Sequence, residues 1–233
     1  MMNKTFFDFE TSGLHPQFDQ ILTAFFITFD EQGNEVDRLE ERCALDLHRL
    51  PCPEALMVNG LSASSLKQHQ SQRELLQKVH AYIIRNTPSV FFAHNARFDN
   101  NFLANAFYQN LISDQFWSLK TNGNRLVCSL HLSKAVYAFG SGNIKFELTE
   151  SGHPLFNLSS LSAANGIEIV AHTSRGDVEA LVKLIDLIKT RDPEIYDQAI
   201  YCADKSSSLS VINNQFFSIT SLGFDKNFSP KVF

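Results

Sequence analysis

The chain has 233 residues and a formal net charge of −5, with 44% hydrophobic and 19% charged residues. These values are typical of a globular protein with a sizeable core, and they exclude a basic protein that coats nucleic acid nonspecifically. No apolar run approaches the about 20 residues of a membrane span, the N-terminus does not resemble a signal peptide, and the four cysteines form no Cys-x-x-Cys pair, so we expect a cytoplasmic protein with reduced thiols.

The order of the predicted elements indicates an α/β fold with a mixed sheet. Apolar composition and turn signals predict strands at residues 4–11, 20–29, 36–47 and 89–93. Apolar residues at helical spacing predict helices at about residues 54–58, 72–84, 98–107, 126–138, 158–164 and 174–188. The first three strands are expected to form an antiparallel meander, and the second, which is apolar throughout, is expected to be covered on both faces.

The first predicted strand places two carboxylates, Asp8 and Glu10, one residue apart. Side chains at i and i+2 of a strand point to the same face, with Cα atoms about 6 to 7 Å apart. Such like charges repel each other unless a cation joins them, and hard divalent cations such as Mg²⁺ bind carboxylate oxygens. The pair is therefore half of a candidate metal site. By itself it fits the polar face of an edge strand at least as well.

Three further polar residues lie at strand ends or helix starts. Asp99 lies in the first turn of a predicted helix, where the helix dipole alone accounts for an acid. Asp177 follows Ser174 at the spacing of a capping box, a structural alternative to a site, and His172 precedes the same helix. Together with the pair on the first strand, these residues match a centre of two metal ions about 3.5 to 4 Å apart, with a histidine to take a proton from water.

Three segments in this order, residues 8–14, 94–99 and 172–177, resemble the DEDDh 3′-5′ exonucleases, the family that includes polymerase proofreading domains. The histidine that four residues separate from the last aspartate, where another branch has tyrosine, matches the histidine branch of that family. Within it the chain is similar to the exonuclease domain of bacterial exonuclease I over about residues 4–200. This similarity rests on residues 10–16, 58–61, 97–100, 107–110, 135–138, 158–167 and 189–193.

The resemblance implies a ribonuclease H-like fold, a five-stranded mixed sheet flanked by helices, over residues 1–203. It implies a metal-dependent 3′-5′ exodeoxyribonuclease of DNA repair that hydrolyses single-stranded DNA from the 3′ end and releases 5′-mononucleotides. His172 is the expected general base. Two Mg²⁺ ions, or Mn²⁺ in their place, are expected on Asp8, Glu10, Asp99 and Asp177. Contacts to the substrate are expected from Thr11, Leu61, Asn95, Arg97 and Phe98.

The chain departs from the family in two places. Cys128 and His131 stand where relatives commonly have aspartates. Residues 204–233 are too few for an independent domain, so we expect a tail, or the start of a truncated SH3-like second domain, with residues 206–208 as a linker.

Three other functions fit the same residues. One is an exoribonuclease with the same site, because recognition of the ribose 2′-OH separates RNA from DNA. The others are a polymerase-bound proofreading subunit, disfavoured by the exonuclease I-like segments, and a catalytically weak nucleic-acid-binding module, disfavoured because all five candidate residues are present.

Overall fold

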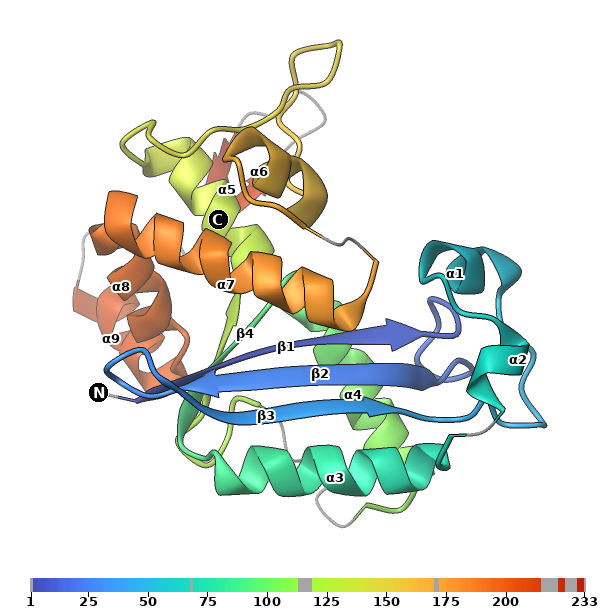
Figure 1. The fold of residues 1–233 in the computed structure, drawn as a ribbon. Helices are drawn as coiled ribbons and strands as arrows, with labels where there is room; N and C mark the ends of the chain where they lie inside the picture. Colours follow the sequence, from blue (N-terminus) through green and yellow to red (C-terminus); the bar gives the residue numbers. More distant parts are fainter. Residues whose placement is uncertain are drawn as a thin grey trace.

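The computed structural model describes residues 2–67, 69–112, 119–169, 172–214, 222–224 and 230–232. Its centre is a five-stranded sheet with helices on both faces (Figure 1). The strands are β1 (Asn3–Thr11), β2 (Ile21–Phe29), β3 (Glu35–Arg42), β4 (Ser89–Ala93) and β5 (Arg125–Cys128), in the spatial order β3-β2-β1-β4-β5. The first three strands are antiparallel, whereas β4 runs parallel to β1 and β5 parallel to β4. The predicted meander and five-stranded mixed sheet are confirmed.

The described helices are α1 (Pro53–Val58), α2 (Ala63–Leu66), α3 (Gln72–Arg85), α4 (Ala96–Gln109), α5 (Ser129–Phe139), α6 (Leu158–Ala164), α7 (Ser174–Arg191), α8 (Pro193–Cys202) and α9 (Lys205–Asn214). In the part of the chain that the structure describes, none of them has the length and apolar character needed to cross a membrane. Two short strands, β6 (Leu222–Phe224) and β7 (Pro230–Val232), pair with each other within the C-terminal segment. The domain boundary at residue 203 stays a prediction.

The single helix predicted over residues 126–138 is wrong in its first turn. Residues up to Cys128 form β5, which pairs with β4, and the helix begins only at Ser129. The apolar side chains of Leu126 and Val127 are buried at this position. A run of four residues that leads directly into a helix carries no periodicity of its own, so only its pairing with β4 identifies it as a strand.

The linker predicted at residues 206–208 is also wrong, because these serines lie within α9. Asp204 stands directly before the helix, and its carboxylate accepts a hydrogen bond of 2.9 Å from the backbone N–H of Ser207. This is the interaction of a helix N-cap. The cap outweighs the weak helix propensity of the serines.

The alternating side chains of β1 supply a core to each face of the sheet. On one face Phe7 stacks on Phe26 at a centroid distance of 5.1 Å, among residues of α3 and α4. On the other face Phe6 stacks on Phe92 at 5.0 Å, among residues of α7. The two carboxylates of β1 occupy even positions, so they share the face of Phe6. Helix α7 packs over this side of β1 (Figure 1).

A chain of buried hydroxyl groups joins three strands to α3. Thr5 on β1 is 2.8 Å from the hydroxyl of Thr28 on β2 and 2.9 Å from that of Ser89 on β4. Thr28 in turn is 2.7 Å from the Tyr82 hydroxyl. Because each buried hydroxyl has a partner, the chain fixes the strands relative to one another without the cost of an unpaired polar group.

We expect Phe7→Ala to lower the free energy of unfolding by about 3–5 kcal/mol, because it removes a fully buried ring that contacts three other phenylalanines. Phe18→Ala is the matched control. Its side chain is 74% exposed, so its removal should change stability by less than about 0.5 kcal/mol. Urea denaturation followed by circular dichroism measures both. Equal losses would contradict this account of the core.

Candidate metal centre

Three of the predicted carboxylates meet at the C-terminal end of β1. Asp8, Glu10 and Asp177 each present a ligand atom, and these atoms all lie within 4.8 Å of one another. The first two leave the same face of β1, and the third comes from the first turn of α7, which packs on that strand. The cluster thus joins residues that are more than 160 positions apart in the sequence.

The start of α7 is tied to the sheet by side-chain hydrogen bonds. The Thr173 hydroxyl accepts a bond of 3.1 Å from the N–H of Gly176 and caps the helix. The Ser174 hydroxyl lies 3.1 Å from that of Thr23 on β2, a residue that pairs with Glu10 in the sheet. The predicted capping box from Ser174 to Asp177 is therefore wrong. Because the cap lies one residue earlier, the carboxylate of Asp177 is directed to the cluster instead.

Asp99 lies beside this cluster in the first turn of α4. It is 2% exposed, and its charge contributes to the raised pKa of Asp8. Among the described residues, nothing donates a hydrogen bond to its buried Oδ1 atom. An unpaired carboxylate oxygen away from water is costly, and a bound cation would give this oxygen a partner.

The pKa values of all four carboxyl groups are raised. Burial is the largest cause in each case and brings the pKa of Glu10 to about 7, that of Asp99 to about 8 and that of Asp177 to about 6. For Asp8, burial and then the repulsion of Asp99, Glu10 and Asp177 raise the pKa well above its ordinary value. A divalent cation removes this repulsion, and an all-carboxylate set of donors fits a hard ion such as Mg²⁺ or Mn²⁺.

His172 stands at the rim of the cluster. Its side chain is exposed, and its backbone has a φ of 63°, in the left-handed region that a non-glycine residue seldom adopts. Its charge and its backbone N–H both lower the pKa of Asp177 against the larger effect of burial. The histidine is therefore a close neighbour of the cluster but is not one of the residues whose ligand atoms converge.

Two predicted substrate contacts lie next to Glu10. The hydroxyl of Thr11 is buried and donates a bond of 2.6 Å to the carbonyl of Gly13, so it serves the turn after β1. Leu61 lines a cavity of about 210 Å³ together with Glu10 and Asn59. The Asn59 side chain also donates a bond of 3.0 Å to the Thr11 carbonyl. Asn59 was not predicted as a site residue, since an asparagine before glycine signals only a turn.

The other three predicted contacts lie at the start of α4. Asn95 is exposed with a φ of 59° and makes no side-chain cap. Phe98 is partly buried and packs on Phe102 at a centroid distance of 4.8 Å. Arg97 is exposed and lines a different cavity, away from Glu10. Of the five predicted contacts, Leu61 and Arg97 thus line two separate cavities.

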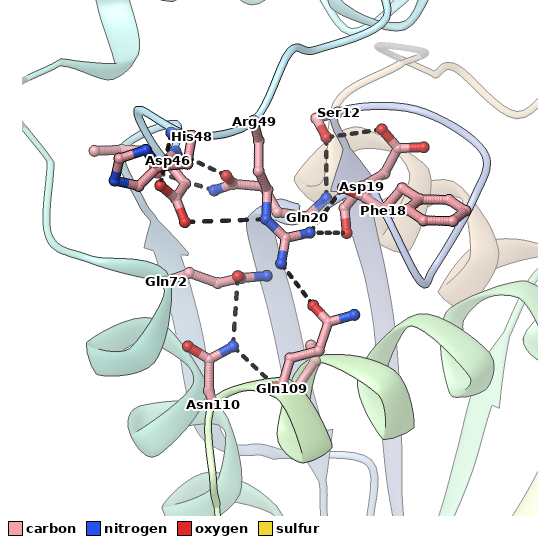
Figure 2. A network of polar contacts seen from close by, with 12 residues as sticks. Ser12, Phe18, Asp19, Gln20, Asp46, His48, Arg49, Gln72, Gln109 and Asn110 are labelled. Atoms are coloured by element: carbon pink, nitrogen blue, oxygen red, sulfur yellow. Dashed lines mark hydrogen bonds and ion pairs between the residues drawn. The ribbon is translucent and has the colours of Figure 1, made fainter.

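A polar network that the sequence does not reveal holds the loop after β1 (Figure 2). The Arg49 guanidinium donates bonds of 2.8 and 2.9 Å to the carbonyls of Phe18 and Asp19, and one of 2.6 Å to Oε1 of Gln109 on α4. The Asp19 carboxylate in turn accepts a hydrogen bond from the Ser12 hydroxyl. The network therefore connects the loop that follows Glu10 to the end of α4, whose first turn carries the fourth carboxylate.

Comparison with known proteins places these features in a family. The model of the RNase T family, described as exonuclease, matches residues 5–185. Exodeoxyribonuclease I of Escherichia coli is 28% identical over 89% of this chain and 44% of its own length. The Haemophilus influenzae protein of the same name is 30% identical over 82% of this chain and 41% of its own length. The chain thus spans less than half the length of these relatives.

Solved structures agree with this assignment. Exonuclease I of E. coli in complex with a dA16 oligonucleotide superimposes with a TM-score of 0.83 at 26% identity, over 91% of this chain and 46% of that one. The ribonuclease H-like fold is thereby confirmed. Because the family model covers most of the chain and the fold is that of exonuclease I, the chain belongs to the RNase T exonuclease family as an exonuclease I-like domain of the DEDDh type.

Proposed function

We propose that the chain is a metal-dependent 3′-5′ exonuclease of the cytoplasm that acts in DNA repair, hydrolysing single-stranded DNA from its 3′ end and releasing 5′-mononucleotides. One observation carries this proposal: the convergence of Asp8, Glu10 and Asp177 beside the buried, unpaired oxygen of Asp99. Exonuclease I of E. coli has been solved with dA16 and dT13 oligonucleotides, which supports single-stranded DNA as the substrate class.

The four carboxylates are proposed to hold two Mg²⁺ ions, for which Mn²⁺ can substitute. Ions bound there would neutralise the developing charge on the phosphate and make water more acidic. The donor atoms are oxygens on rigid elements, β1 and the first turns of α4 and α7. Because Asp8 is close to both Asp99 and Asp177, it is the residue best placed to be shared between two ions.

His172 is proposed to take the proton from the attacking water. The oxygen of that water forms a bond to phosphorus as the bond from phosphorus to the 3′ oxygen of the preceding nucleotide breaks, which releases a 5′-mononucleotide. The exposed position of the imidazole lets it return the proton to solvent. The backbone N–H of His172 donates a hydrogen bond to the Asp177 carboxylate, which keeps the histidine next to the cluster. Leu61 and Asn59 line the cavity next to Glu10 and are proposed to contact the terminal nucleotide.

We expect a 5′-labelled single-stranded oligonucleotide to be shortened from its 3′ end in Mg²⁺ and to remain intact in EDTA. Asp177→Asn should lower the rate about 10³-fold, because it removes a carboxylate of the centre. Asp186→Asn, which changes an exposed aspartate of the same helix, should leave the rate unchanged. Gel electrophoresis of the products measures all of these.

The same assay is repeated with duplex DNA and with RNA of the same sequence to distinguish the alternative functions. Activity that survives EDTA would contradict the metal-dependent mechanism. Faster degradation of RNA would indicate an exoribonuclease. A lack of cleavage of every substrate would indicate a binding module.

The role of His172 can be separated from that of a metal ligand. We expect His172→Gln to lower kcat by about 10²–10⁴-fold, the range for loss of a general base, without weakening Mn²⁺ binding. Asp8→Asn should weaken both kcat and Mn²⁺ binding. Isothermal titration calorimetry with Mn²⁺, in parallel with kinetics, measures the two effects. Loss of Mn²⁺ affinity in the histidine variant would show that His172 is a ligand instead.

The raised pKa values predict how stability depends on pH in the metal-free protein. A carboxyl group whose pKa is higher in the folded state than in the unfolded state holds its proton more tightly when folded, so stability falls as pH rises. The pH range in which stability falls begins near the pKa of about 4 that these groups have in the unfolded state. It extends through their pKa values in the folded state, which are about 6 for Asp177, about 7 for Glu10 and about 8 for Asp99.

We therefore expect the Tm in EDTA to fall steadily between pH 5 and pH 8.5, and Mg²⁺ to reduce this fall, because the ion binds the ionised cluster. Circular dichroism during heating measures the Tm at each pH. Asp177→Asn should make the profile in EDTA flatter, since one of the titrating groups is gone. A Tm that rises with pH in EDTA would contradict the electrostatics of the cluster.

A further inference from the structure

A second cavity, of about 590 Å³, lies between α4, α5 and α8. Its lining includes Arg97, Lys120 and His131, and among the described residues that line it there is no carboxylate. None of the four candidate metal ligands lines it either. The cavity is large enough for a small organic molecule, and its charge favours one that is anionic.

Cys128 and His131 form a pair in the wall of this cavity. Cys128 ends β5 and stands directly before α5, and it is partly exposed. Burial raises the pKa of its thiol, but the His131 imidazole and the backbone N–H groups of His131 and Ala96 outweigh burial, so the pKa is lowered. The pKa of His131 is raised, chiefly by its hydrogen bond to Cys128. A partly exposed thiol beside an imidazole, in a cavity whose lining carries cations, has the arrangement of a nucleophilic cysteine.

The other cysteines have different surroundings. Cys43 is buried, with a pKa raised to about 12 by its burial. Cys52 donates its hydrogen to the Glu54 carboxylate at 3.0 Å. Cys202 lines the same cavity as Cys128, but its sulfur accepts a hydrogen bond of 3.3 Å from the Gln198 amide. Within the described part of the chain, Cys128 is the one thiol of the four that is paired with an imidazole in a cationic cavity.

We propose that Cys128 is a site of covalent modification by small disulfides that carry carboxylate groups. The thiolate attacks one sulfur of the reagent, a new disulfide forms at Cys128, and the reagent's own disulfide breaks. The other half of the reagent leaves as a thiolate, and the His131 imidazolium, which no longer has a thiolate partner, releases its proton to solvent. The exchange needs no further oxidant. Arg97 and Lys120 attract the carboxylates and raise the concentration of the reagent at the sulfur.

The test uses the folded chain with 5,5′-dithiobis(2-nitrobenzoate), a disulfide with two carboxylates, and with 4,4′-dithiodipyridine, a neutral disulfide. We expect Cys128 to be the first residue modified by the anionic reagent, about tenfold or more ahead of the other three thiols. Absorbance of the thiolate released from the anionic reagent, or of the thiopyridone released from the neutral one, gives the rate, and mass spectrometry of peptides locates the modification. First modification of Cys202 or Cys52, or reaction of Cys128 only in urea, would overturn the proposal.

Substitutions distinguish attraction of the reagent's carboxylates by the cavity from simple accessibility of the Cys128 sulfur. Arg97→Gln combined with Lys120→Gln should slow the anionic reagent about tenfold and leave the neutral reagent nearly unchanged. Equal slowing of both reagents would overturn recognition of the carboxylates. His131→Gln should slow both reagents about tenfold, while Cys202→Ser should slow neither. Circular dichroism confirms that each variant is folded. The measurement requires no nuclease activity, so its outcome is independent of the function proposed above.

Discussion

The alternation of side chains along β1 is the constraint on which both the core and the candidate metal centre depend. Phe7 lies under α3 and α4, while Phe6, Asp8 and Glu10 share the face that α7 covers. A slip of one residue in the pairing with β2 would turn the carboxylates into the phenylalanine core, where they would lose water without gaining a partner. Folding in the correct register and assembly of the cluster are therefore the same event.

The carboxylate cluster destabilises the folded protein that holds it together. Four acids with raised pKa values lie within one region, and the packing of β1, α4 and α7 holds them there despite their repulsion. The hydrogen bond between Thr23 and Ser174 contributes directly to this positioning, since it fastens the start of α7 to the strand residue opposite Glu10. Functional sites commonly carry such unfavourable interactions, which the surrounding core offsets.

Much of this arrangement could be predicted from the sequence, because long apolar runs and helical spacing define β1, β2, β4, α3 and α7. The same patterns give wrong predictions at two places, the start of α5 and the N-cap of α7. The apolar residues of β5 run into α5 without a turn signal, and the adjacent hydroxyls of Thr173 and Ser174 are equally good caps by residue type. The roles of Arg49 and Asn59 depend on partners 30 or more positions away. Residue type and spacing contain no signal for such contacts.

The network around Arg49 has a consequence for local motion at this end of the sheet. The loops that it joins carry large apolar side chains that contribute little to the core, since Leu14 and Phe18 are more than 70% exposed and Leu47 and Leu50 more than 90%. Hydrogen bonds near the surface therefore hold these loops, and they can open at a much lower free energy than the sheet. Opening of this kind would release the chain beyond Thr11 while the phenylalanine core remains folded, so we expect backbone amides at this rim to exchange without global unfolding.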